Sequence, residues 1–89
     1  METTIDIMYD ETEMTPTRFI GFVGEYGRFD LAITSTTHFF GKTIVHCLQT
    51  GRTAILSAEE AEQADYIQSA FQISEQEADE LSLFLSANL

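Results

Sequence analysis

The sequence is poor in several residue types, and each shortage excludes a class of protein. It has a single cysteine, Cys47, so it forms no internal disulfide and gives no sign of an oxidising compartment. It has one proline, no tryptophan and no apolar run approaching the roughly 18 residues of a membrane span. The first residues lack the basic and apolar regions of a secretory signal. We therefore expect a cytoplasmic protein.

Basic residues are equally scarce. Four Lys and Arg stand against fifteen Asp and Glu, which gives a formal net charge of −11. Residues 1–16 carry five acids and no base, residues 17–53 carry all four bases with two acids, and residues 54–89 carry eight acids and no base. A field of this sign repels nucleic-acid phosphates and anionic membranes. We expect neither to be a direct partner.

Sequence motifs typical of catalytic, phosphate-binding and metal-binding sites are also missing. The sequence has no glycine-rich phosphate loop, no paired Cys-x-x-Cys, no His-Glu-x-x-His and no Gly-x-Ser-x-Gly. His46 and Cys47 are adjacent in an expected strand, where neighbouring side chains point to opposite faces. The acids of residues 10–13 lack the spacing of a calcium loop and predict a solvated loop. We expect no enzyme, no catalytic residue, no cofactor and no metal site.

The residues that are present predict one α+β domain over 1–89, with a strand-rich part, 1–56, and a helical part, 57–89. Two-residue alternation and turn signals predict an antiparallel meander sheet of four to five strands. Two C-terminal helices are expected to pack on one face of this sheet. The expected strands are residues 4–9, 18–23, 28–36, 43–49 and 53–56.

The two expected hairpins each imply a register. If Gly24 faces Gly27 across a two-residue turn, Phe22 lies opposite Phe29. The same register pairs Ile20 with Leu31 and Arg18 with Ile33. In the second hairpin the expected pairing is Gln49 with Arg52 around Thr50-Gly51, with Gly51 at positive φ.

Two capping boxes mark the helices. Ser57 and Ser74 are each followed three residues later by a glutamate, Glu60 and Glu77. Apolar spacing over residues 65–73 fits a helical stripe, and a strand over the same residues is the alternative. The segment after Ser74 predicts an amphipathic helix.

A helix pair covers only one face of such a sheet, and the other face is not polar. Phe19 and Val23 point away from the richer apolar face, and the loop at residues 36–41 presents His38, Phe39 and Phe40. Either this loop anchors another chain or one of its phenylalanines plugs the end of the core. The five residues predict an interaction surface for a homodimer or for another protein. An acidic decoy that occupies a basic nucleic-acid-binding surface is the alternative, and a small enzyme is the third interpretation.

Several short motifs resemble one family across nearly the whole chain. The family consists of short acidic cytosolic proteins of Gram-positive bacteria with a domain of unknown function. The resemblance implies a free-standing domain and supplies no catalytic residue, cofactor or substrate. The motifs are Arg18-Phe19, Gly24-Glu25, Arg28-Phe29-Asp30-Leu31-Ala32, Phe40-Gly41-Lys42, Gln49-Thr50-Gly51-Arg52, Ala70-Phe71, Glu77-Ala78, and Leu81 with Phe84-Leu85.

Overall fold

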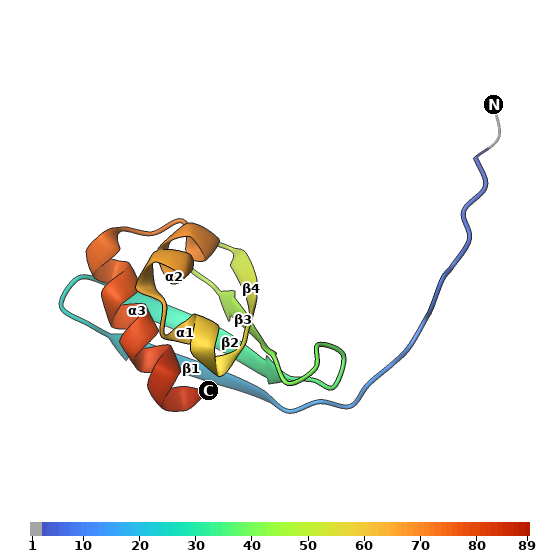
Figure 1. Ribbon diagram of the computed structural model, residues 1–89, viewed down its shortest axis with the longest axis horizontal. Coiled ribbons are helices and arrows are strands. Elements are labelled where there is room, and N and C mark those ends of the chain that lie inside the picture. The colour runs from blue at the N-terminus through green and yellow to red at the C-terminus, as the bar shows by residue number, and fades with distance from the viewer. Residues whose placement is uncertain (1–2) are drawn as a thin grey trace.

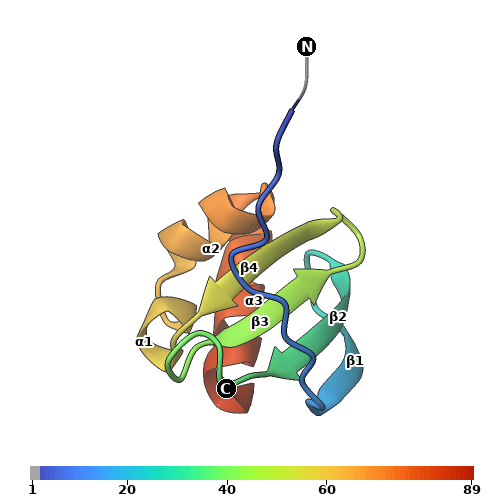
Figure 2. The same ribbon diagram turned by 90° about the vertical axis from the view of Figure 1, so that its right-hand side faces the viewer.

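Four antiparallel strands form one sheet in the order β1-β2-β3-β4, and three helices follow them (Figures 1 and 2). The computed structural model describes residues 3–89. This architecture confirms the α+β class and the meander sheet with C-terminal helices. The elements are β1 (Thr17–Val23), β2 (Arg28–Ser35), β3 (Thr43–Cys47), β4 (Arg52–Leu56), α1 (Ala58–Ala61), α2 (Ala64–Phe71) and α3 (Glu75–Asn88).

The β1–β2 hairpin has the predicted register. Phe22 pairs with Phe29 and Ile20 with Leu31. The N–H of Gly24 donates to the carbonyl of Gly27 over 2.7 Å, which closes the turn. The register therefore turns one apolar row of β2 toward the helices. Its members, Phe29, Leu31 and Ile33, are buried.

The predicted register of the β3–β4 hairpin is wrong by two residues, because Arg52 pairs with Cys47 and not with Gln49. The turn is longer than expected, and the N–H of Gly51 donates to the carbonyl of Cys47 over 2.9 Å. Gln49 therefore lies in the turn and outside the β3–β4 ladder, and its side chain forms hydrogen bonds with Asp30. A shift of two preserves which face each side chain occupies, so the predicted core residues remain inside. The positive φ of Gly51, 71°, is confirmed.

Both expected helical regions are helical, and both capping boxes are present. The first region is divided into α1 and α2 because Gln63 takes an extended conformation between them. α2 contains two fully buried residues, Ile67 and Phe71, and contacts β4 and α3. The strand alternative for residues 65–73 is therefore wrong. None of the helices within residues 3–89 combines the length and apolarity needed to cross a bilayer.

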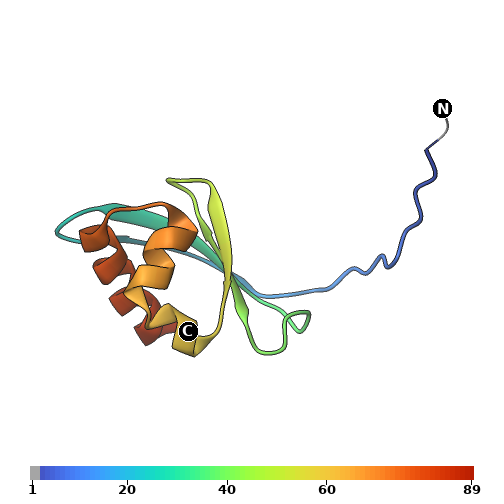
Figure 3. The ribbon, with the colours of Figure 1, turned by 45° about the horizontal axis from the view of Figure 1, so that its top comes forward.

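The predicted strand at residues 4–9 is absent. This segment belongs to an extended arm that leaves the domain (Figures 1 and 3). Its alternating residues find no neighbouring strand, and Ile5, Ile7 and Tyr9 are all exposed. Alternation alone predicts the extended conformation, but a strand also needs a partner, which local sequence does not supply.

The core lies between the sheet and the helices, on one side of the sheet only (Figure 2). Phe22 of β1 stacks on Phe84 of α3 with ring centroids 4.2 Å apart. Ser82 of α3 is buried and donates its hydroxyl to the carbonyl of Ala61 over 2.6 Å, which joins α3 to α1. The helices thus use one sheet face and leave the other face to solvent.

Candidate interaction surface

The sheet face opposite the helices is the outer face, and its two most exposed large apolar side chains belong to β1. Phe19 and Val23 are each 79% exposed. The register places Ala32 beside Phe19, and Ile44 of β3 beside Ile55 of β4, on the same side. Ala32, Ile44 and Ile55 are partly buried. The outer face therefore carries apolar side chains on all four strands, and the most exposed of them lie on the edge strand β1.

The polar side chains of the outer face are largely paired with one another. The Asp30 carboxylate lies 3.2 Å from Nε of Arg28 and accepts a hydrogen bond from the Gln49 amide, and the Asp30 N–H donates to Oε1 of Gln49. Nδ1 of His46 lies 2.6 Å from the hydroxyl of Thr53. His46 is therefore a partly buried residue of the sheet whose ring has a side-chain partner. A ligand of this face meets few free polar groups.

A cluster around Glu13 forms where the arm joins the domain. Oε2 of Glu13 accepts from the Thr36 hydroxyl over 2.8 Å, and Oε1 accepts from the Thr37 N–H over 3.1 Å. His38 lies between two carboxylates, with Nδ1 2.9 Å from Glu13 and Nε2 3.1 Å from Glu11. Both ring nitrogens donate only in the imidazolium form. The cluster of Glu11, Glu13, Thr36, Thr37 and His38 is hereafter the arm anchor.

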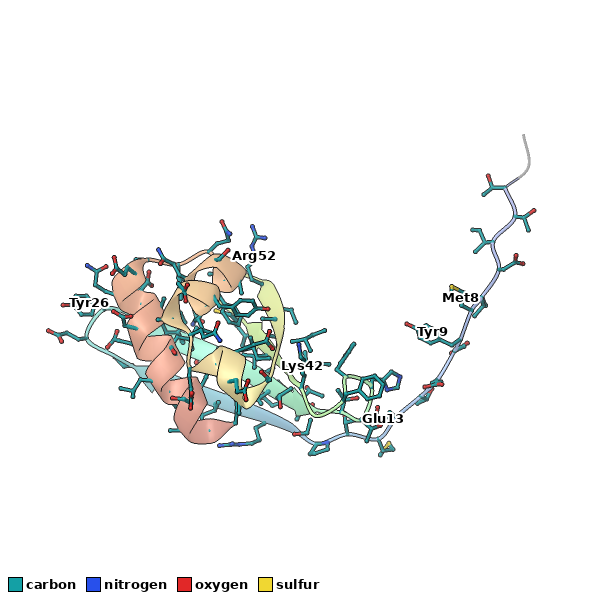
Figure 4. All side chains as sticks on the ribbon, viewed as in Figure 1. Met8, Tyr9, Glu13, Tyr26, Lys42 and Arg52 are labelled. Atoms are coloured by element: carbon teal, nitrogen blue, oxygen red, sulfur yellow. The ribbon has the colours of Figure 1, made fainter. Side chains whose placement is uncertain are left out.

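The prediction of a solvated loop at residues 10–13 holds for Asp10, Glu11 and Thr12, which are exposed. Glu13 departs from it, because its carboxylate binds three consecutive residues of the β2–β3 loop. Figure 4 shows Glu13 next to this loop, while Met8 and Tyr9 lie well away from the sheet. Sequence reasoning missed Glu13 because its partners are more than twenty residues away. The composition of the segment gives no signal of such a tertiary contact.

The hydrogen bond from Thr36, followed by that from the Thr37 N–H, lowers the pKa of Glu13 despite the opposing effect of desolvation. A lowered pKa means that the anchor stabilises the fold above the ordinary glutamate pKa of 4.5 and loses this contribution as the pH falls through the lowered value. We predict that the Thr37 amide chemical shift, followed by NMR from pH 7 to pH 3, moves as the pH falls below the ordinary glutamate pKa of 4.5 and Glu13 is protonated.

The substitution Glu13→Gln should shift the Thr37 amide resonance at pH 7 and remove this titration. Glu11→Gln is the matched control, because Glu11 contacts His38 and has no hydrogen bond to Thr37. A Thr37 resonance that is the same in Glu13→Gln and in the unmodified protein would contradict the anchor.

The two phenylalanines of the β2–β3 loop differ in their exposure to solvent. Phe40 is 99% exposed and has a φ of 49°, a left-handed conformation that a bulky residue rarely adopts. Phe39 is 37% exposed and lines a depression of about 240 Å³ together with His38 and Ile44. Neither side chain belongs to the buried core, so the interpretation of a core plug is wrong.

The five predicted interaction residues form two groups. His38, Phe39 and Phe40 lie at the end of the sheet where β1 begins, because Thr17 pairs with Thr34 just before this loop. Val23 lies at the other end of β1, roughly 20 Å away along the strand. Phe19 lies between them and nearer the loop. Ile44 joins the first group and was not predicted as a site residue.

No cluster of three or more His, Cys, Asp or Glu side chains able to hold a metal occurs among residues 3–89. The Cys47 thiol is buried. The arrangement offers surfaces for binding and presents no assembled group of reactive side chains in the described part of the chain.

These features define a small α+β domain with a single antiparallel sheet, one face of which is open. A family model described as SAV0927-like matches residues 8–87, so the chain belongs to this family, whose members are uncharacterised. No curated protein matches the chain.

Proposed function

We propose that the protein is a non-enzymatic interaction module whose outer face binds an apolar segment of another protein. The observation that carries this proposal is the exposure of Phe19 and Val23, 79% each, on the regular edge strand β1, with partly buried Ala32 beside Phe19. A large apolar side chain held on a rigid strand loses little freedom on binding, so most of the free energy of its burial favours the complex.

The charge of the outer face limits the kind of partner. Its one basic side chain at the Val23 end, Arg28, is paired with the carboxylate of Asp30. A partner segment made mainly of apolar residues therefore fits this face. The arm anchor and Phe39 extend the same surface at its other end through the depression next to Ile44.

A site-specific photo-crosslinker tests the proposal. Placed at position 19 in cells that make the protein, it should give a discrete crosslinked protein. At position 66, a Tyr on α2 that is 40% exposed, it should give none. With the crosslinker at position 23, Phe19→Asp should abolish the product. Met14→Asp, a change at a residue that is 97% exposed between the arm anchor and β1, should leave it intact.

Equal crosslinking from positions 19 and 66, or a product that survives Phe19→Asp, would overturn the outer face as the binding surface. The partner identified in this way is then purified, and its affinity is measured with the same two variants.

The helical side supports a second candidate function, an acidic decoy for a basic nucleic-acid-binding surface. Residues 57–89 contain eight acids and no base, and within the described chain only Glu60 of these acids forms a salt bridge, 3.1 Å from Nζ of Lys42. Salt separates the two candidates, because the binding of a decoy collapses as ionic strength rises and an apolar contact persists. Complex formation at 0.5 M salt would exclude the decoy.

A further inference from the structure

The arm, residues 3–10, has the pattern of a strand without a strand neighbour. Ile5, Ile7 and Tyr9 recur at every second position and are 83%, 76% and 72% exposed. Its eight residues match the length of β1, which has seven. Single exposed aliphatic residues are common on protein surfaces, but three in strict alternation on an extended segment are the pattern of an edge-pairing strand.

β1 is an edge strand, so one side of its backbone has no strand beside it. Along this edge, on the helix side, an apolar groove of about 360 Å³ lies between β1 and α3. Leu83 is 74% exposed at its rim, and the carboxylate of Glu80 already accepts from the N–H groups of Glu25 and Tyr26. The groove is lined by Phe22, Gly24, Glu80, Leu83, Phe84 and Ala87.

We propose that the arm of one copy adds to the β1 edge of a second copy as a fifth strand, with Ile5, Ile7 and Tyr9 facing the β1–α3 groove. The backbone of β1 then gains a ladder partner. Alternation places Asp6, Met8 and Asp10 of the arm on the outer-face side, the side of Phe19 and Val23 of β1. The arm therefore matches the edge in length and in its apolar pattern.

The arm anchor explains why the acceptor is a second copy. Glu11 and Glu13 hold the root of the arm on the β2–β3 loop, and the N–H of Ser35 donates to the carbonyl of Pro16 over 3.2 Å. These contacts lie on the β2 side of β1, away from its open edge. The arm is thereby directed away from the domain to which it belongs (Figures 1 and 4). The exchange uses the β1 edge and the groove, so it stands apart from the proposed function of the outer face.

Light scattering coupled to size-exclusion chromatography, at tens of micromolar protein in physiological salt, tests the exchange. The unmodified protein should have the mass of a dimer. Ile7→Asp in the arm and Leu83→Asp at the groove should each weaken dimerisation at least about tenfold, because each puts a charge into the apolar contact. Met14→Asp, at an exposed position between the arm and β1, should remain dimeric.

Mixing the two defective variants gives the decisive result. Leu83→Asp keeps an intact arm and Ile7→Asp keeps an intact groove, so an equimolar mixture should regain dimers that neither variant forms alone. A monomeric unmodified protein, a mixture that stays monomeric, or dimers insensitive to both substitutions would overturn the exchange. Crosslinking from position 19 in Leu83→Asp reports separately on the outer face, so either proposal can fail without the other.

Discussion

Replacing Phe71 by alanine is expected to lower the free energy of unfolding by about 3–5 kcal/mol, the range for truncating a fully buried phenylalanine. Phe71 is fully buried at the end of α2, among the largest side chains of the core. The truncation leaves a cavity, because the surrounding core relaxes only partly around the missing ring. A domain of this size has a total stability of only about 5–10 kcal/mol, so much of it would be lost.

Urea denaturation followed by circular dichroism measures this effect. Tyr66→Ala is the matched control, because it removes an aromatic side chain from the same helix at a position that is 40% exposed. We expect the control to cost no more than about 1 kcal/mol. Equal losses for the two variants would mean that α2 does not present Phe71 to the core.

The parts of the fold that were predictable depend on neighbouring residues. The turn between Gly24 and Gly27 determines the β1–β2 register because a short loop leaves few ways to align its strands. The capping boxes at Ser57 and Ser74 are equally local, since each closes within four residues. Such elements can be read from sequence because the groups that stabilise them are adjacent in the chain.

The predictions are wrong where a contact with a residue distant in the sequence determines the conformation. The sequence predicts that Gln49 pairs with Arg52 in the β3–β4 ladder. In the structure Gln49 lies in the longer turn, where its side chain forms hydrogen bonds with Asp30, nineteen residues away. Residues 4–9 have a strand pattern, yet the arm anchor keeps them from the sheet. In both cases local propensity is correct and a tertiary contact overrides it.

The candidate surface was predictable in part for the same reason. Phe19 and Val23 follow from strand parity alone, which fixes the face of each side chain once the strand is recognised. Phe40 follows from the loop, although its left-handed conformation does not. Glu13 and Ile44 join the surface only through contacts between segments that are distant in sequence. Their inclusion required the structure.

Replacing Glu80 by alanine is expected to cost about 2 kcal/mol, although the side chain is not in the core. Its carboxylate accepts from the backbone N–H groups of Glu25 and, over 2.8 Å, of Tyr26, and so joins the β1–β2 turn to α3. Hydrogen bonds to a charged acceptor contribute about 1.5–3 kcal/mol each when buried. The expected cost is smaller than the sum of the two because both bonds are exposed to solvent.

Amide hydrogen exchange distinguishes this local tie from a general loss of stability. In Glu80→Ala the amides of Glu25 and Tyr26 should exchange faster by a larger factor than those of β3. Glu80→Gln should be intermediate, because an amide oxygen still accepts but carries no charge. Asp79→Ala is the matched control, since Asp79 is an exposed acid on the same helix turn.

Gly24→Ala should imitate Glu80→Ala, because its new methyl group would occupy the space of the Glu80 carboxylate. If Gly24→Ala and Glu80→Ala act independently, so that their costs add in the double variant, the turn is not held by this carboxylate.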